Sequence, residues 1–312
     1  MLENRTNTRI TVLRGGPSSE RDVSLVSGAA VADACRRLGY VVWESDVTPD
    51  NLAALDRECD LVFPVLHGPF GEDGQLQSLL EKRSLRYVGS DSHASRLAMD
   101  KAMSKHAWRQ AGLPTAPWQA VTSVEEFSSS HRDAANAEVV VKPACEGSSI
   151  GVFLCDTHDK LQQVVSELVP KFGKVIIEKR LIGPELTVGI LGDTPLPVVQ
   201  IKPAAGFYDY EAKYNRDDTE YLLQPTIDTA TYAEVQRIAL KAFQVLRCRD
   251  YGRIDLIVDE ILGPQLLEIN TIPGFTSHSI LPKAAQHAGI EFDQLVETLV
   301  EMGLQRMANE AT

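Results

Sequence analysis

The segment between residues 251 and 278 restricts the possible folds more than any other part of this chain. Residues 253–259 and 265–270 are two runs rich in Ile, Leu and Val, and Gly263 and Pro264 form a turn signal between them. We predict two strands that pair as a hairpin. Because strand side chains alternate between faces, Glu268 and Asn270 share one face, and Asp255 can face them from the paired strand.

This hairpin gathers two carboxylates and an amide oxygen in a small volume. Oxygen ligands of this kind suit Mg²⁺ or Mn²⁺, which keep water and bind substrate phosphates in their remaining positions. Acidic residues on a hairpin are more often solvent-exposed, and the hairpin alone favours that interpretation. Arg253 lies close by in sequence, and a turn at Pro273 and Gly274 can present N–H groups to an anion. Together these features suggest a metal–nucleotide site.

The composition places limits on the class of protein. The chain has 312 residues, 44% hydrophobic and 24% charged, which is enough for two or three domains with separate cores. A net charge of −12 argues against a general nucleic-acid or membrane-surface binder. The five cysteines are dispersed without C-x-x-C spacing, so we expect reduced thiols. We expect no signal peptide and no membrane span, since no segment approaches about 20 apolar residues.

Residues 1 to about 97 have the pattern of an α/β domain. A strand at 10–13 leads through a glycine turn into a helix that ends near Leu38. Glu20 lies near the start of that helix, where it either favours the helix dipole or holds a substrate ammonium; alone, the first interpretation is preferred. His67 follows a buried strand at 60–66, the end of a strand where ligands bind in open parallel sheets. A lone histidine there is more often structural.

The middle of the chain combines a helix, strands and a small-residue loop. We predict one helix over residues 95–111, with Lys101 and Lys105 on one face as exposed charges. Lys142 lies inside an apolar strand at 139–143, where burial is costly unless the ammonium meets an anion. The loop at 144–151 is suited to binding phosphate oxygens, although it is not a Walker loop.

The remaining segments alternate strand and helix patterns. Strands are expected at 175–179, 186–191 and 197–201, with a free strand edge that can recognise adenine. Residues 207–215 contain four aromatic side chains and a lysine without periodicity, which suggests a lid over a ligand. Helices are expected at 232–247 and 291–306.

Several motifs follow one another along nearly the whole chain: LRGGPSSERDVSL, VLHGPFGEDGQLQ, MDK at residues 99–101, VVVKPACEGSSIGV, IIEKRLIGPELTV, FYDYEAKY, YGRIDL and LLEINTIPGFTSHS. Together they resemble the motifs of the D-alanine–D-alanine ligases of the ATP-grasp superfamily. The resemblance implies an α/β ATP-grasp fold: an N-terminal open parallel-sheet domain of residues 1–97 that binds substrate, and two α+β subdomains, 98–182 and 183–312, that enclose the nucleotide.

The resemblance also implies the reaction. ATP would phosphorylate the carboxylate of one D-alanine, and the amine of a second would attack the acyl phosphate, giving D-alanyl-D-alanine for peptidoglycan synthesis. A cytoplasmic location and a homodimer formed through the first domain are implied as well. Charge neutralisation by metal ions and cationic side chains is what phosphoryl transfer requires.

The resemblance assigns roles to residues on the amino-acid side. Glu20 would hold the ammonium of the first D-alanine, near His67. Arg253 and the Gly274 N–H would stabilise the oxyanion, at a value of roughly 3–4 kcal/mol per donor. Ser148 and Tyr214 would form a hydrogen-bonded triad with Glu20. Ser279 and Ile280 would contact the second D-alanine.

The nucleotide side is assigned in the same way. The resemblance places Lys101, Lys142 and Lys213 on phosphates. Ser148 belongs to the phosphate loop. The base and ribose would be held by Glu178, Lys179, Leu181, Glu185 and Phe207. Asp255, Glu268 and Asn270 match the ligands of two Mg²⁺ or Mn²⁺ ions, in agreement with the cluster derived from strand alternation.

The sequence departs from the family pattern at two positions and leaves two alternatives open. Cys145 stands where many relatives carry a bulkier polar residue, and Ile272 where a small residue is common. The alternatives are a D-alanine–D-lactate ligase, disfavoured by Tyr214, and a silent nucleotide sensor, disfavoured by the intact metal and arginine positions.

Overall fold

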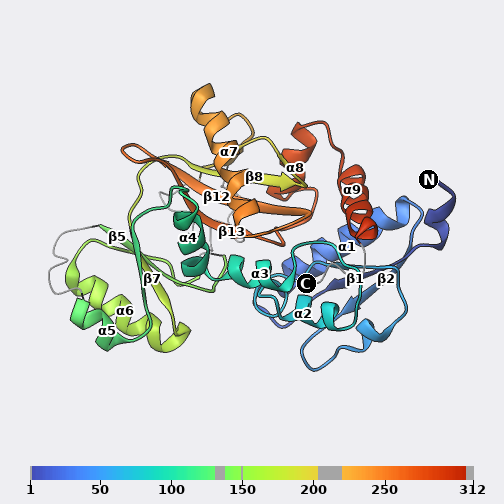
Figure 1. The fold of residues 1–312 in the computed structure, drawn as a ribbon, viewed down its shortest axis with the longest axis horizontal. Coiled ribbons are helices and arrows are strands. Elements are labelled where there is room, and N and C mark those ends of the chain that lie inside the picture. The colour runs from blue at the N-terminus through green and yellow to red at the C-terminus, as the bar shows by residue number, and fades with distance from the viewer. Residues whose placement is uncertain (1, 131–137, 149, 203–219, 307–312) are drawn as a thin grey trace.

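The computed structural model describes residues 2–130, 138–148, 150–202 and 220–306. They form three β-sheets with covering helices, and the sheets follow one another along the chain (Figure 1). Two short 3-10 helices, η1 (Leu2–Asn7) and η2 (Ala53–Asp56), lie in the first part. The predicted lid, residues 207–215, lies outside the described residues.

The first sheet is parallel, with strand order β2-β1-β3. Its strands are β1 (Arg9–Arg14), β2 (Val41–Asp46) and β3 (Leu61–Pro64), and its helices are α1 (Arg21–Arg37) and α2 (Gln75–Lys82). Side chains alternate between two cores: Ile10 and Val12 pack with α1, whereas Leu13 packs with Leu76 and Leu80 of α2. Both faces are covered, as parallel sheets require.

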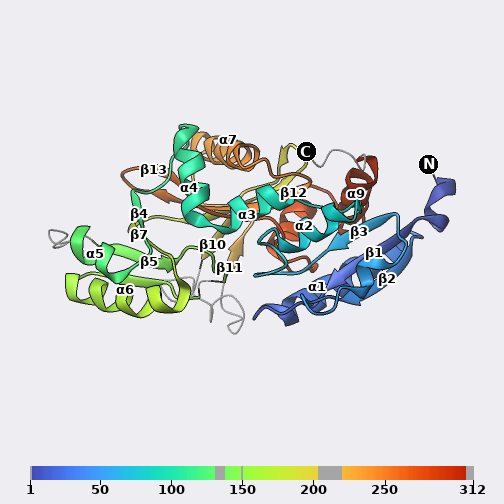
Figure 2. The same cartoon turned by 60° about the horizontal axis from the view of Figure 1, so that its bottom comes forward.

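The last helix, α9 (Phe292–Gln305), also packs on this first sheet. Its Leu295 and Leu299 share a core with Val31 of α1, and a side chain at Gly303 would collide with Leu61 of β3. Arg306 donates to the Tyr87 carbonyl oxygen at 2.6 Å. Figure 2 shows α9 beside the sheet that carries β1 and β2.

The second sheet is antiparallel, with strand order β4-β7-β5-β6. It consists of β4 (Trp118–Val121), β5 (Val139–Pro143), β6 (Phe153–Cys155) and β7 (Val175–Lys179), and α5 (Val124–Ser130) and α6 (His158–Phe172) accompany it. Val141 and Ile177 pack with α6 on one face. Alternation turns Lys142 and Glu178 to the opposite face.

The third sheet carries the hairpin predicted from the sequence. Its order is β11-β10-β8-β12-β13, with β9 paired to β8. The bounds are β8 (Glu185–Leu191), β9 (Thr194–Pro195), β10 (Val199–Lys202), β11 (Glu220–Leu222), β12 (Tyr251–Asp259) and β13 (Gly263–Asn270); α7 (Thr229–Val245) and α8 (Ile280–His287) follow β11 and β13. The predicted turn position was wrong, because Gly263 and Pro264 pair with Asp259 and Val258 inside the strands. The turn is at residues 260–262.

The single helix predicted over residues 95–111 is two helices, α3 (Ser92–Met99) and α4 (Lys101–Gln110). Asp100 between them has extended backbone angles, φ −87° and ψ 100°, and its carboxylate accepts from the N–H groups of Ala102 and Met103. An aspartate N-cap of this kind starts a new helix, and the periodic pattern across it concealed the break. Trp108 of α4 is buried against α7, where its Nε1 donates to the Ala242 carbonyl at 3.1 Å.

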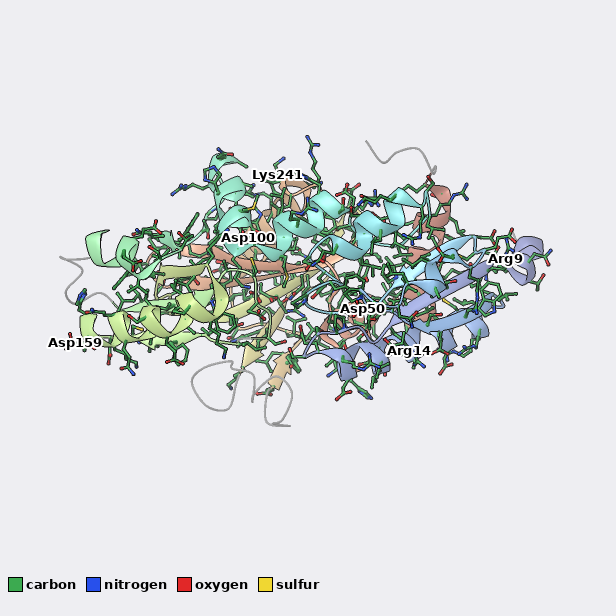
Figure 3. All side chains as sticks on the ribbon, turned by 90° about the horizontal axis from the view of Figure 1, so that it is seen from below. Arg9, Arg14, Asp50, Asp100, Asp159 and Lys241 are labelled. Atoms are coloured by element: carbon green, nitrogen blue, oxygen red, sulfur yellow. The ribbon has the colours of Figure 1, made fainter. Side chains whose placement is uncertain are left out.

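The three sheets form an elongated molecule. Figure 3 shows Asp159 of the second sheet's helix α6 and Arg9 of the first sheet toward opposite ends, with Asp100 between them. No helix in the described ranges is sufficiently long and apolar to cross a bilayer.

Candidate active site

Two cavities lie side by side in the middle of the molecule. The first, of about 370 Å³, is bounded by the second and third sheets. The second, of about 250 Å³, is bounded by the first domain and the segment after β13. Lys101, Glu146 and Glu268 line both cavities. Ligands in the two cavities would therefore meet at this shared wall.

The β12–β13 hairpin places Asp255 directly opposite Glu268 in register, as alternation predicted. The even-numbered Ile254 and Leu256 face the core formed with α7, so Asp255 faces the first cavity. Asp255 accepts from Arg253 at 3.0 and 2.8 Å and from Thr187 Oγ1 at 2.6 Å. Asn270 is opposite Arg253 and lines the second cavity.

These oxygen donors are of the type that a hard divalent cation takes. Within the described residues, no group of three His, Cys, Asp or Glu side chains has a metal-binding arrangement. The candidate metal ligands comprise two carboxylates, those of Asp255 and Glu268, and the amide oxygen of Asn270 as a third donor. The donor set therefore fits Mg²⁺ or Mn²⁺, which complete their coordination with water and phosphate oxygens.

A buried cluster of charges forms one wall of the first cavity. The Glu178 carboxylate makes an ion pair with Lys142 through Oε1 and with Lys105 through Oε2, at 2.9 Å for Lys105. Burial alone would raise the pKa of Glu178, but the attraction of the two lysines outweighs it and lowers the pKa to about 2. Burial would lower the pKa of Lys142, yet Glu178 and Glu268 raise it. This buried cluster is therefore ionised, and it combines two lysines with one carboxylate.

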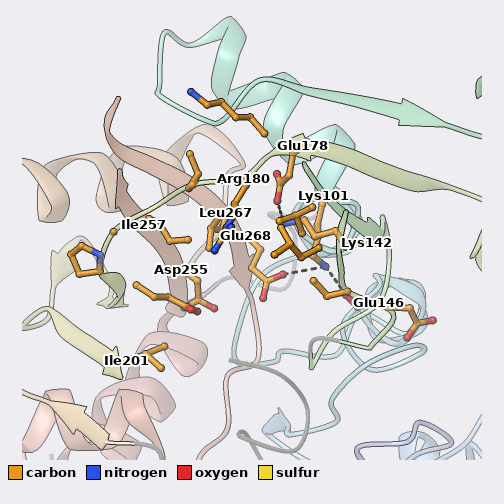
Figure 4. A pocket seen from close by; sticks show the side chains of 18 of the residues that line it. Lys101, Lys142, Glu146, Glu178, Arg180, Ile201, Asp255, Ile257, Leu267 and Glu268 are labelled. Atoms are coloured by element: carbon orange, nitrogen blue, oxygen red, sulfur yellow. Dashed lines mark hydrogen bonds and ion pairs between the residues drawn. The ribbon is translucent and has the colours of Figure 1, made fainter. Parts of the chain in front are cut away.

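The expectation that Lys101 and Lys105 are exposed was wrong. Lys101 is 7% exposed and Lys105 is 0% exposed. The Nζ of Lys101 donates to the Glu146 carbonyl oxygen at 2.5 Å and lies 3.2 Å from Glu268 Oε2. Figure 4 shows this ion pair reaching across the cavity from Lys101 to Glu268, with Asp255 beside Glu268. Both lysines are buried because α4 packs between the second and third sheets, which helix periodicity does not reveal.

In the second cavity, Glu20 connects the first domain to the loop after β5. Ser148 Oγ donates to Glu20 Oε1 at 2.5 Å. The Ser148 backbone is left-handed, with φ 52°, a conformation that costs free energy for any residue with a side chain. A side chain at Gly147 would approach Glu20 Oε2 to 3.4 Å. The loop thus lies close against the Glu20 carboxylate.

His67 and Glu72 hold the segment after β13 from the first domain. His67 Nδ1 is 2.8 Å from the Ile272 carbonyl oxygen, and Glu72 accepts from Gly68 N–H at 2.6 Å and Ile272 N–H at 3.3 Å. Burial, followed by the charge of Glu20, raises the pKa of Glu72 to about 8. Burial lowers the pKa of His67. Both groups are therefore uncharged near neutral pH, in contrast with Glu178.

The turn after Ile272 carries the last predicted residues. Phe275 N–H donates to Ser27 Oγ at 3.1 Å, which anchors the turn to α1. The Ser279 Oγ accepts from Thr276 N–H at 3.1 Å, and a side chain at Gly274 would approach that Oγ to 3.2 Å. Ser279 precedes α8, whose first residue is Ile280. The backbone of Gly274 and the hydroxyl of Ser279 are thereby presented together.

The structure brings the described candidate residues to these two cavities. Those on the first are Lys101, Lys142, Glu178, Lys179, Leu181, Glu185, Asp255 and Glu268. Those on the second are Glu20, His67, Ser148, Arg253, Asn270, Gly274, Ser279 and Ile280. Phe207, Lys213 and Tyr214 lie outside the described residues. Sequence reasoning gave no role to Glu72, Lys105 or Glu146; for Glu72, its place in the glycine-flanked GEDG run was the available signal.

Two antiparallel sheets around a lysine-lined cavity, next to a parallel-sheet domain, define an ATP-grasp ligase. Models of the D-ala D-ala ligase N-terminus and C-terminus match residues 40–90 and 107–301, and the chain belongs to this ligase family. It is 43% identical over 289 residues to D-alanine–D-alanine ligase B of Chromobacterium violaceum, covering 92% of this chain and 95% of that one. Membership gives its reaction class, the ATP-dependent joining of two D-alanine molecules.

Solved structures of such ligases have a similar fold. The D-alanine–D-alanine ligase of Bacillus anthracis complexed with ATP has a TM-score of 0.82 at 29% identity, covering 96% of this chain and 98% of that chain. The VanG D-Ala:D-Ser ligase of Enterococcus faecalis has a TM-score of 0.84 at 26% identity, covering 95% and 99%.

Proposed function

We propose that the two cavities divide the ligase reaction between them, with ATP in the first and D-alanine in the second. The observation that carries this proposal is the shared wall: Lys101 and Glu268 line both cavities, with Asp255 directly opposite Glu268. A carboxylate in the second cavity would then lie next to the terminal phosphate of a nucleotide in the first. Proximity of this kind accounts for much of the rate of group transfer.

In the first cavity, Lys101 and Lys142 would bind phosphate oxygens. Glu178, Lys179 and Leu181 line this cavity at and just after the end of β7, which is an interior strand of the second sheet with no free edge. They would contact adenine where the chain leaves the sheet, and Glu185 would hold the ribose. Asp255, Glu268 and Asn270 would hold two Mg²⁺ or Mn²⁺ ions. Such ions neutralise charge on phosphate oxygens. We retain Lys213 and Phe207 as proposed phosphate and base contacts.

In the second cavity, Glu20 would bind the ammonium of the first D-alanine, near the uncharged His67. The D-alanine carboxylate attacks the terminal phosphorus of ATP, and ADP leaves. The amine of the second D-alanine then attacks the acyl carbon, with Arg253 and the Gly274 N–H donating to the developing oxyanion. Collapse expels phosphate, and the nitrogen loses its proton. Ser279 and Ile280 would contact the second D-alanine.

Ser148 would connect this chemistry to the phosphate loop through Glu20. Tyr214 is proposed as the third member of that hydrogen-bonded group. We also propose a division into units 1–97, 98–182 and 183–312, a cytoplasmic location and a homodimer formed through the first domain. Light scattering in solution tests the dimer, for which a molecular mass near 34.3 kDa would be contrary evidence.

A coupled assay of ADP release tests the proposal. We expect release with ATP, Mg²⁺ and D-alanine, D-alanyl-D-alanine as product, and little release with L-alanine. D-lactate and D-serine, each offered with D-alanine, test the second substrate. Predominant ester product would indicate the D-lactate alternative. ATP binding without ADP release from any of these substrates would indicate a sensor.

A further inference from the structure

Lys105 is a buried lysine directly behind the first cavity. Its Nζ lies 2.9 Å from Glu178 Oε2, 2.7 Å from Thr115 Oγ1 and 3.1 Å from the Leu266 carbonyl oxygen. The contacts with Thr115 and Leu266 are hydrogen bonds that the ammonium donates, and the contact with Glu178 is an ion pair. Lys105 is 0% exposed and does not line the first cavity.

Lys142 shares the same carboxylate but differs in position. It pairs with the other oxygen of Glu178 and lines the first cavity, which Lys105 does not. Burial lowers the pKa of Lys105 to about 8, with Glu178 opposing that shift, and Lys105 remains mainly protonated at pH 7. The cluster therefore contains two positive charges and one negative charge. Its net charge of +1 lies where phosphate groups are proposed to bind.

We propose that Lys105 is a positioning residue that neutralises Glu178, so that the charge of Lys142 is available to the phosphates of the nucleotide. Without Lys105, the single negative charge of Glu178 would be balanced by Lys142, and the cluster would present no net charge. At these short separations in a buried site, Coulomb energies are large compared with those in water. The inference rests on the proposed binding of nucleotide in the first cavity.

A purely structural role for Lys105 is the competing explanation. Lys105 joins β7, through Glu178, to β13, through Leu266, and Thr115 Oγ1 also donates to the Leu266 carbonyl at 2.9 Å. In that case its removal would disturb the spacing of the sheets. Base and phosphate binding would both suffer, and a second substitution at Glu178 would add to the damage.

The test compares dissociation constants for ADP and adenosine, measured by calorimetry with Mg²⁺ present. The ratio of the adenosine to the ADP constant isolates the phosphate contribution. We expect Lys105→Met to reduce this ratio about tenfold, and Lys105→Met/Glu178→Gln to restore it to within about threefold of the native value. The double variant restores the net charge to +1, with Lys142 as the remaining ion.

Glu178→Gln alone provides a second measurement if Lys105→Met does not fold. Its cluster carries a net charge of +2, so the ratio should rise above the native value. Thermal unfolding of each variant checks the fold. An unchanged ratio in Lys105→Met, no recovery in the double variant, or a fall in Glu178→Gln would overturn the role of Lys105. Failure of the native protein to bind ADP would instead overturn the proposed nucleotide site, and this inference with it.

Discussion

The two cavities differ in the charge state of their buried carboxyl groups. In the first cavity, where we propose that the nucleotide binds, Glu178 is held charged by two lysines, with its pKa lowered to about 2. In the second cavity, where we propose that D-alanine binds, Glu72 accepts from the backbone N–H groups of Gly68 and Ile272, and burial raises its pKa to about 8. The first wall is suited to a polyanion, and uncharged acid and imidazole groups line the cavity in which we propose that a small zwitterion binds.

This contrast shows that the identity of the neighbours, more than burial itself, decides the charge state of a buried carboxyl group. Glu178 and Glu72 are 4% and 9% exposed, so burial is similar. Four substitutions test the contrast, and they are ordered from the largest expected effect to the smallest.

Arg253→Met should have the largest effect, because Arg253 lines the second cavity and also pairs with Asp255 of the first. We expect kcat to fall roughly 100- to 1,000-fold, the usual cost of losing an oxyanion donor. Steady-state ADP release measures the loss. Adenosine affinity serves as the control and should change little. A fall of less than about tenfold would separate Arg253 from the chemistry of both cavities.

Glu268→Gln should reduce turnover by roughly 100-fold, since we propose that Glu268 binds a metal ion, and such a ligand contributes a few kcal/mol of charge stabilisation. Higher Mg²⁺ concentration should recover part of the activity, measured as a titration of ADP release. Glu260→Gln is the matched control, because Glu260 is exposed in the turn of the same hairpin. Unchanged activity and Mg²⁺ dependence in Glu268→Gln would remove Glu268 from the site.

Ser148→Ala should affect the amino-acid side selectively. It removes the donor to Glu20 Oε1, a hydrogen bond to a charged group worth roughly 1.5–3 kcal/mol. We expect the KM for D-alanine to rise about tenfold and the KM for ATP to change less. Initial rates with each substrate varied in turn give both constants. Equal increases in the two would argue that the loop serves both cavities alike.

Glu72→Gln should change activity least, and its effect should depend on pH. The pKa of Glu72 in the folded protein, about 8, is above the ordinary glutamate pKa of 4.5. The contribution of protonated Glu72 to the free energy of unfolding is therefore complete below pH 4.5 and is lost as pH rises through 8. Gln resembles the uncharged carboxyl group. Relative to the native protein, the free energy of unfolding of the variant should therefore increase by roughly 1–3 kcal/mol between pH 5 and 9.

Urea unfolding at several pH values measures this difference. Glu125→Gln, at an exposed position on α5, is the control and should show no such trend. A stability difference that does not change with pH would mean that Glu72 is already ionised. The amino-acid cavity would then resemble the nucleotide cavity, and the contrast would fail.

Local patterns in the sequence predicted much of this architecture. Alternation placed Asp255 opposite Glu268, and the cost of burying Lys142 in an apolar strand indicated an anionic neighbour. The identity of that neighbour was not accessible, since Glu178 lies on a different strand. The family resemblance implied that Glu178 contacts adenine, and it did not indicate the ion pairs of Glu178 with Lys105 and Lys142.

Two features were predicted wrongly from the sequence: the exposure of Lys101 and Lys105, which depends on long-range packing, and the single helix over residues 95–111, which is interrupted by an N-cap. Lys105 has the sequence context of an exposed helix residue, and its burial depends on Thr115 and Leu266 arriving from other segments. Asp100 interrupts a helical pattern without disturbing its periodicity, because one N-cap residue is enough to redirect the chain. The two lysines that follow it, Lys101 and Lys105, owe their direction to that break.

The position of α9 has a consequence for the order in which this molecule can be built during synthesis. Ribosomes release a chain from its amino end, and domains tend to fold as they emerge. Here one face of the first sheet remains incomplete until Leu295, Leu299 and Gly303 arrive. The earliest domain to be made is thus among the last to be finished, and its apolar face is open to chaperones until then.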